Sequence, residues 1–354
     1  DVRAVAVDSN GVLPMAVPER TFTTAYSFRR FLQKTLPDHL PDLPAPDPLK
    51  DGLRPLAEGT LAGVLAEWPM ADVDELLGVP GDPADSSRLA DLPIDQDVTA
   101  LPGNGGRASG LRVLERFLDS TLSRYGEDRN HPDRDGASGL SPWLHWGHVS
   151  AHEVLHGVMT REGWSPLRLS PDTDGRRSGW WGLTASSESF LDELVTWREI
   201  GFNMCVRNPD TYDRYESLPE WARQTLAEHA SDPRPGYTLD FLDGADTPDE
   251  LWNAAQRQLR RDGVIQNYLR MLWGKKILEW SPTPRDALDA MIELNNRYAL
   301  DGRDPNSWSG IFWVLGRYDR GWPERPVFGK VRSMTSASAR RKLDLKGYLE
   351  RYGT

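Results

Sequence analysis

The stretch YLRMLWGKKILEW, residues 268–280, is the segment from which the fold of the C-terminal half of this chain can be interpreted. Trp273 and Trp280 lie seven residues apart within it. Seven residues of an α-helix advance about 10.5 Å and return to within about 20° of the same direction, so both rings are expected on one helix face. Aromatic residues at this spacing usually form a buried stripe, and the spacing alone therefore indicates only a core helix.

The residues on either side carry start and stop signals for further helices. Residues 247–250 (Thr-Pro-Asp-Glu) form a capping box with proline at the first helical position, which predicts a helix to about Arg261, ended by Asp262-Gly263. A second helix is expected over 264–280, and Thr-Pro at 283–284 begins a third that runs to about Tyr298. The C-terminal part of the chain is therefore expected to be predominantly α-helical.

A third tryptophan belongs with the first two. Trp252 lies 21 residues before Trp273, on the preceding helix of this predicted antiparallel pair. The turn between the helices could bring its ring back beside the other two. Three neighbouring rings could form a relay for electrons, because tryptophan is readily oxidised by one electron.

The N-terminal part has a different character. The segment VRAVAVDSNGVLPM (2–15) alternates like one strand, and a helix is expected from about Phe22 to Leu36. Two Pro/Gly-rich stretches follow, LPDHLPDLPAPDP (36–48) and LPGNGGRASG (101–110). Apolar residues then recur at helical spacing from Leu111 to Leu122, so we place a boundary before this helix.

The composition excludes several classes of protein. Only 38% of the 354 residues are hydrophobic, and no apolar run approaches the ~18–20 residues of a membrane helix. The start, DVRAVAVDSNGV, lacks a secretory signal, which favours the cytoplasm. Cys205 is the single cysteine, so an internal disulfide and a four-cysteine metal site are excluded.

Five motifs, in this order, resemble those of class II cyclobutane pyrimidine dimer photolyases, of the photolyase/cryptochrome family. They are SGLSPWLHWGHVS (138–150), LWNAAQ (251–256), RMLWGKKILEW (270–280), LDGRDPN (300–306) and GWPERPVFGKVR (321–332). The resemblance runs from about Arg107 to the C-terminus and is weaker before it. It implies a helical FAD-binding domain and light-driven repair of pyrimidine dimers in DNA. No metal is implied.

The resemblance assigns residues to FAD. Arg270 and Asp301 match an ion pair beside the isoalloxazine ring, and Asn295 matches the asparagine that faces the flavin N5 region. Small residues suit the flavin phosphates because they let backbone N–H groups approach an anion, although such a stretch taken alone would be an ordinary turn. The matching phosphate-side and further flavin residues are Tyr125, Ala137, Ser138, Gly139, Leu140, Ser141 and Asp304.

Other positions match the substrate site. Glu193 matches the carboxylic acid that hydrogen-bonds the dimer, while Trp197 and Trp313 match an aromatic pair that brackets the flipped dimer. Met271 matches a residue that packs on the dimer. Without the family match, Glu193 could be a solvated helix carboxylate and Trp197 a core residue.

The resemblance also gives the tryptophans roles. Trp273, Trp252 and Trp280 occupy the proximal, middle and distal places of a relay that supplies electrons to the flavin. Repair is a separate process, in which light excites FADH⁻, an electron passes to the dimer, the cyclobutane ring opens and the electron returns.

Double-stranded DNA containing pyrimidine dimers is the implied partner. The net charge of −11 argues against general attraction to DNA, but residues 316–346 hold nine Lys/Arg against three Asp/Glu. Arg129 is a further candidate for a DNA-side contact. A solvated basic face is the alternative for the C-terminal cluster, whose candidates for phosphate contacts are Lys330, Arg332, Arg340, Arg341 and Lys342.

The chain departs from the family pattern at both small and large scale. We expect residues 1–20 to be a remnant of an N-terminal α/β antenna domain, 21–106 a helical and Pro-rich linker, and 107–354 the catalytic domain. No antenna chromophore is therefore expected in this chain, and we expect a monomer. SWSG (307–310) replaces a usual Gly-Tyr, GVIQNY (263–268) lacks a usual His-Gly, and residues 172–189 are an insertion that could line the DNA face or pack as a loop.

Two other functions were weighed. A cryptochrome-like photoreceptor would keep FAD and the relay without repair, but it would not need Glu193, Trp197, Met271 and Trp313. A flavoenzyme acting with light on a substrate other than DNA is the third possibility, against which the basic C-terminal cluster speaks only mildly.

Overall fold

The computed structural model describes residues 7–41, 50, 52, 59–68, 70, 72, 92–101 and 105–353. Residues 1–42 and 101–354 form one compact unit, and residues 43–100 form another. The smaller unit holds helix α2 (Thr60–Glu67), which has no buried residue. Of the strand-like segment 2–15, residues 2–6 lie outside the described residues, and residues 7–15 form no strand, so this part of the expectation is wrong. None of the described helices is long and apolar enough to cross a membrane.

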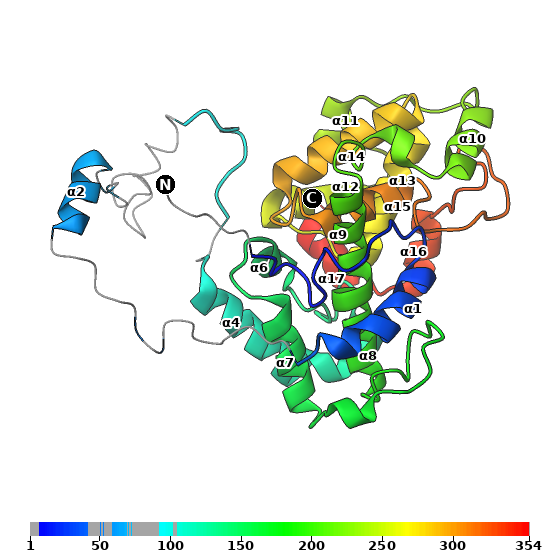
Figure 1. Ribbon diagram of the computed structural model, residues 1–354. Coiled ribbons are helices and arrows are strands. Elements are labelled where there is room, and N and C mark those ends of the chain that lie inside the picture. The colour runs from blue at the N-terminus through cyan, green and yellow to red at the C-terminus, as the bar shows by residue number, and fades with distance from the viewer. Residues whose placement is uncertain are drawn as a thin grey trace. The chain divides into compact units, whose positions relative to one another are not determined.

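Helices build the larger unit, as predicted, and its described residues form no β-strand beyond one isolated bridge between Arg325 and Gly329. Figure 1 shows the arrangement. The helices are α1 (Ala25–Thr35), α4 (Arg107–Arg116), α5 (Tyr125–Asp128), α6 (Ser141–His145), α7 (Ala151–Arg161), α8 (Ala185–Leu191), α9 (Arg198–Arg207), α10 (Glu220–Glu228), α11 (Leu239–Asp243), α12 (Glu250–Asp262), α13 (Asn267–Trp280), α14 (Pro284–Tyr298), α15 (Pro305–Val314), α16 (Ser336–Lys342) and α17 (Lys346–Tyr352).

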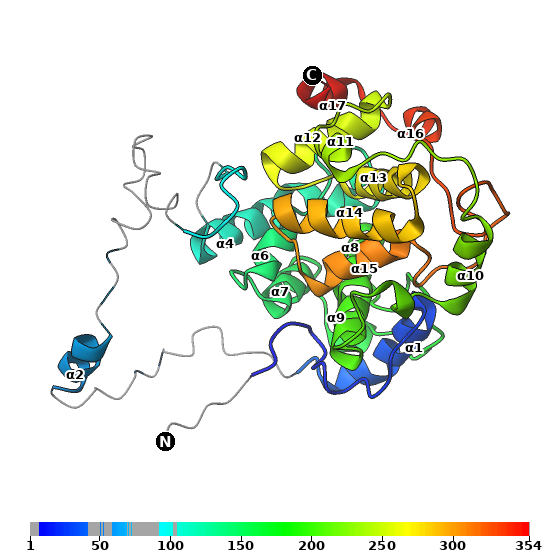
Figure 2. The same cartoon turned by 90° about the horizontal axis from the view of Figure 1, so that it is seen from above.

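Two apolar cores hold these helices together. Helices α12 to α15 supply most of the first core, and Figure 2 shows α13, α14 and α15 side by side. The second core joins α1, α4, α7, α8 and the chain entering α9. Tryptophans occur in both cores, so most of them contribute buried apolar area whatever else they do.

The helix ends confirm most of the predicted signals and correct one. Gly263 ends α12 with a left-handed φ of 66°, and Thr283 caps α14, as expected. The predicted cap at Thr247 is wrong: Asp249 caps α12, because its carboxylate accepts the N–H of Trp252. Thr247 is instead held by Asn253, which accepts its backbone N–H at 3.0 Å.

A polar face of α9 binds the N-terminal segment. The carboxylate of Glu199 accepts the backbone N–H groups of Val12 at 2.6 Å and Leu13 at 3.3 Å. Four residues later, Asn203 accepts the N–H of Phe22 at 3.0 Å. After four more, Arg207 donates to a carbonyl of the same segment, that of Ala16. Residues four apart share one helix face, so this ladder fixes the segment along α9.

The carboxyl group of Glu199 makes the stability of this arrangement depend on pH. Burial raises its pKa to about 8, although the N–H groups of Val12 and Leu13 and the charge of Arg198 oppose this. Between about pH 5 and 8 the folded protein therefore holds a proton that the unfolded chain has released, and stability falls as pH rises.

Glu199→Gln should remove this dependence, because the amide keeps an acceptor for the N–H groups but does not titrate. We expect the free energy of unfolding of the wild type to fall relative to that of the variant as pH rises from 5 to 8, measured by urea unfolding. Glu19→Gln, which changes an exposed carboxylate of the same segment, is the control. Parallel curves for wild type and Glu199→Gln would contradict the prediction.

Candidate active site

Helices α9 and α15 meet at backbone contact. A Cβ atom at Gly201 would lie 2.6 Å from the carbonyl oxygen of Pro305, so the helices can approach this closely only because position 201 has no side chain. Trp197 lies one turn before Gly201, and Trp313 lies on α15. The contact therefore sets the separation of the two helices that carry the predicted aromatic pair.

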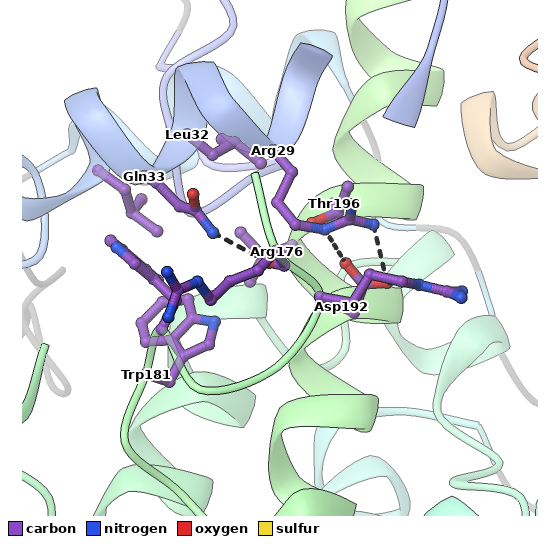
Figure 3. A pocket seen from close by; sticks show the side chains of 11 residues that line it. Arg29, Leu32, Gln33, Arg176, Trp181, Asp192 and Thr196 are labelled. Carbon is purple, nitrogen blue, oxygen red and sulfur yellow. Dashed lines mark hydrogen bonds and ion pairs between the residues drawn. The ribbon is translucent and has the colours of Figure 1, made fainter. Parts of the chain in front are cut away.

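The residues before α9 form a π-helical segment, Asp192–Trp197, which is anchored to α1. Arg29 binds Asp192 through two hydrogen bonds, at 2.7 and 3.0 Å, and both side chains are buried (Figure 3). Gln33, one turn further along α1, donates to the carbonyl of Arg176 in the predicted insertion. The pocket in Figure 3 therefore lies where α1, the predicted insertion and the π-helical segment pack together. None of the residues that line it is assigned to FAD.

Glu193 lies next to Asp192 and pairs with Arg129 at 2.6 Å. Both groups are only partly exposed, with 30% and 20% of their side chains accessible. Burial raises the pKa of Glu193, while the charge and hydrogen bond of Arg129 act in the opposite direction. The neutral form of Glu193, which can donate a hydrogen bond, is thereby favoured.

Tyr125, predicted to contact the flavin, also joins this pair. Arg129 donates to its hydroxyl at 3.3 Å, and its ring packs against Phe117 and Phe190. Burial raises the pKa of Tyr125 to about 12. Among the described residues, Tyr125, Arg129 and Glu193 are thus brought together.

The four predicted substrate residues share an intermediate exposure. Trp197 is half-buried within a run from Leu194 to Met204 that is otherwise buried. Met271 and Trp313 are also half-buried, each followed by a buried residue on its helix. The Met271 methyl group reaches α15, within 4.0 Å of the place of a Cβ on Gly310. Large side chains left half-covered in this way can still bury area against a ligand.

Asp301 joins three of the five motifs. Ser141 donates to one of its carboxylate oxygens at 2.7 Å, and Arg270 lies 3.3 Å from the other. Burial alone would raise the pKa of Asp301, but Arg270 and Ser141 hold it below its usual range. The carboxylate is therefore ionised and paired at neutral pH, as a buried charge must be.

Two further contacts dock residues 138–150 onto residues 300–306. His145 Nδ1 lies 3.2 Å from Asp304 Oδ2, and the Trp146 indole donates to the Leu300 carbonyl at 3.0 Å. Asp304 also caps α15, accepting the N–H of Asn306 at 2.8 Å. Segments about 155 residues apart in the sequence are thus joined at the start of α15.

The predicted phosphate stretch combines one buried anchor with exposed small residues. Leu140 is buried in the second core, whereas Ala137, Gly139 and Ser141 are exposed. Gly139 has a left-handed φ of 68°. The Ser138 hydroxyl accepts the Leu140 N–H at 3.3 Å. Such a turn presents small residues and polar groups without bulky side chains.

Asn295 lies near the end of α14 and is buried. It donates to the Ser307 hydroxyl at 2.7 Å, so one residue of the unusual SWSG segment directly contacts a predicted flavin residue.

The three relay tryptophans are buried, with 0%, 2% and 8% of Trp252, Trp273 and Trp280 exposed. The Trp252 indole donates to the backbone carbonyl of Trp273 at 3.0 Å. The rings of Trp252 and Trp280 lie 5.4 Å apart between centroids, edge to face. Trp252 therefore contacts the ring of Trp280 and the backbone of Trp273.

The five basic C-terminal candidates for DNA contacts differ in their surroundings. Arg332 lies over the rings of both Trp313 and Trp322, 5.6 and 5.0 Å from their centroids. Arg340 instead forms an ion pair with Glu250. Lys330, Arg341 and Lys342 are exposed.

Two site-adjacent residues were missed by sequence reasoning. Lys275 is fully buried; it donates to the Val314 carbonyl and lies 5.2 Å from the centroid of Trp313. Gln256 is also fully buried and accepts the Trp273 indole N–H. Both residues lie inside the motifs quoted above. Each is a polar residue on a helix face that is otherwise apolar, and this pattern could have marked them as buried groups with a specific hydrogen-bond partner.

Proteins named deoxyribodipyrimidine photo-lyase are similar to this chain over most of its length. The protein from Arabidopsis thaliana is 35% identical over 351 residues, which is 97% of this chain and 63% of that protein. Those from Oryza sativa and Potorous tridactylus are 42% and 39% identical over 68% and 72% of this chain, and 44% and 45% of their own lengths. The chain is a homologue of the deoxyribodipyrimidine photolyases.

Solved structures show that this photolyase homologue has the helical fold of photolyases and cryptochromes. A bacterial class III photolyase from Agrobacterium tumefaciens matches with a TM-score of 0.56 at 16% identity, over 97% of this chain and 61% of its own. A Synechocystis cryptochrome matches with a TM-score of 0.50 at 18% identity, over 73% and 47%. No family model matches the chain.

The photolyase homologue spans between 44% and 63% of the length of the three relatives described above. Its predicted flavin residues fit FAD by their chemistry. Ser138 supplies a hydroxyl beside an exposed left-handed glycine, and Arg270 supplies a partly exposed cation. Phosphates and an anionic flavin need donors of these kinds.

Asp301→Asn should destabilise the photolyase homologue, because it leaves Arg270 without its counter-charge. We expect a loss of about 3 kcal/mol at pH 7. The loss should shrink as pH falls below about 4, because the carboxylate of the unfolded wild type binds a proton there, whereas the folded one, with its lowered pKa, does so only at lower pH. Urea unfolding at the two pH values measures both effects.

Asp289→Asn, an exposed change on α14, is the matched control and should leave stability within about 0.5 kcal/mol. If Asp301→Asn were as stable as this control at pH 7, Asp301 would not be the junction of the three motifs.

Proposed function

We propose that the chain repairs cyclobutane pyrimidine dimers in DNA by light, using FAD as FADH⁻. One observation carries the proposal: the large side chains of Trp197, Met271 and Trp313 are left half-covered, each directly followed by a buried residue. A photoreceptor has no need of such an aromatic clamp. Stacking between large side chains is how proteins hold a base taken out of the duplex.

FAD would be held by residues 137–141 at its phosphates and by Arg270, Asp301 and Asn295 at its ring. When bound and fully reduced, it supplies the photoexcited electron that opens the dimer. The Arg270–Asp301 pair keeps a cation at this position without an unpaired buried charge.

Glu193 would hydrogen-bond the carbonyl edge of the dimer. Burial raises its pKa and so favours the protonated form more than in an ordinary glutamate, and donation to an oxygen that gains negative charge becomes stronger as the charge develops. Arg129, already paired with Glu193, would orient this group and lie next to the DNA.

The DNA phosphates would be bound by Lys330, Arg332, Arg341 and Lys342, because phosphate contacts need accessible cations. Arg340 would have to exchange its ion pair with Glu250 to join them. Because the whole chain has a charge of −11, binding should be local to this face and sensitive to salt.

Further assignments from the sequence are part of the proposal. They are a class II type, a cytoplasmic monomer, and the division into residues 1–20 of an α/β domain, a linker region (21–106) and a catalytic domain (107–354).

The deciding experiment mixes the chemically reduced, FAD-loaded protein with a dimer-containing oligonucleotide under near-UV or blue light and follows loss of the dimer. Repair is expected in light and not in darkness. Absence of repair by protein that demonstrably holds reduced FAD would refute the proposed function.

Glu193→Gln keeps the shape of the side chain but replaces the titratable carboxyl group by an amide. It therefore tests whether repair depends on the protonation of Glu193. Wild-type repair should decline as pH rises through the raised pKa of Glu193, because the carboxylate cannot donate. The amide of Glu193→Gln does not titrate, so its repair should be weaker, by about tenfold, but independent of pH. Arg129→Gln should move the decline to higher pH, since the cation that lowers the pKa of Glu193 is gone. A variant profile with the wild-type decline would exclude Glu193 as its source.

Trp273→Phe should block photoreduction of oxidised FAD by more than about tenfold while leaving repair by chemically reduced protein unchanged, because only the first step needs the relay. Flavin absorbance under illumination measures the first, and the oligonucleotide assay the second. Trp164→Phe, in the other core, is the matched control. Equal photoreduction in Trp273→Phe and the control would remove Trp273 from the relay.

A further inference from the structure

A buried chain of hydrogen bonds starts at the indole of Trp273. Its Nε1–H donates to Gln256 Oε1 at 2.9 Å, and Gln256 Nε2 donates to Asp243 Oδ1 at 3.3 Å. Gln256 is fully buried and Trp273 is 2% exposed. The other carboxylate oxygen of Asp243 accepts the hydroxyl of Tyr298 at 3.0 Å.

The carboxylate fixes which end of the amide faces the ring. Turning the Gln256 amide over would place its oxygen against the carboxylate of Asp243 and its NH₂ group against the indole N–H. Both contacts would then be repulsive, so the oxygen must face Trp273.

We infer that Gln256, oriented by Asp243, is a positioning residue of the relay that keeps the indole proton on Trp273 while the ring is oxidised. The inference rests on the proposed relay. An amide oxygen is a very weak base, so it accepts the hydrogen bond without removing the proton. The carboxylate of Asp243 is partly exposed and also lies 3.9 Å from Arg260 and 3.6 Å from Arg297. Its hydrogen bond to the amide still polarises the amide and strengthens this acceptor for the buried indole.

The electron and proton balance follows from these contacts. One electron leaves Trp273 for the flavin, and Trp273 is refilled by one electron from Trp252, with no proton leaving either ring. The Trp252 indole also donates to a non-basic acceptor, the Trp273 carbonyl. A ring that lost its proton would become a neutral radical and would oxidise its neighbour less readily, so protonated rings let the positive charge move on towards Trp280.

Gln256→Met tests the inference, because it keeps the length of the side chain and removes the acceptor. Transient absorption of the FAD-loaded protein should show the yield of charge separated as far as Trp280 reduced by about tenfold, since a hydrogen bond to a charged group is lost. In ¹⁵N-tryptophan-labelled protein, NMR should show the Trp273 indole proton moved upfield, with the other indole signals unchanged.

Gln258→Met is the matched control, because Gln258 lies on the same helix and accepts from Tyr348 away from the tryptophans. Asp243→Asn is a second test that leaves Gln256 in place, and it should lower the charge-separation yield by a smaller factor. An unchanged yield in Gln256→Met would overturn the inference, as would a Trp273 indole signal at its wild-type position. Neither measurement contains DNA, so failure of dimer repair would refute the proposed function and leave this inference standing.

Discussion

The ion pair between Arg270 and Asp301 is the interaction on which the rest of the site depends. Its carboxylate also accepts the Ser141 hydroxyl, so helices α6 and α13 and the turn before α15 are held at one buried point. A buried pair of charges contributes little net stability over apolar packing, but losing one partner is costly. The pair thus acts mainly to specify which segments meet, and the flavin and substrate residues take their positions from that meeting.

Much of this architecture could be predicted from the sequence because its signals are local. Gly263 and Thr283 end and begin helices through their own backbone and side chain, without help from distant residues. The cap of α12 was misplaced because Thr247 and Asp249 carry equally good signals, and the choice is made by Asn253, which holds Thr247. Long-range pairings such as Arg29 with Asp192, and Glu199 with the segment at Val12, leave no periodic trace in the sequence. The tryptophans of the insertion, Trp180 and Trp181, proved to be core residues, a choice that their sequence context left open.

The predicted relay tryptophans and the predicted clamp residues differ in their surroundings. The relay tryptophans are enclosed, and the two inner indole N–H groups meet oxygen atoms that cannot take a proton. The clamp residues are half-covered and lie near ionisable groups, Glu193 and Arg332 among them. Sequence spacing could not distinguish these classes, since both occur on amphipathic helices. The difference arises from packing, which excludes water from one set and leaves area available on the other.

The contact between Gly201 and Pro305 has a consequence for what the site can accept. Because the α9 and α15 backbones touch there, the width between the helices is fixed by main-chain atoms, which do not adapt as side chains do. In the proposed function, this fixed width would limit how thick a group can be and still fit between Trp197 and Trp313. A single methyl group at position 201 would reset that width, and selectivity could change without any alteration to a residue that touches the substrate.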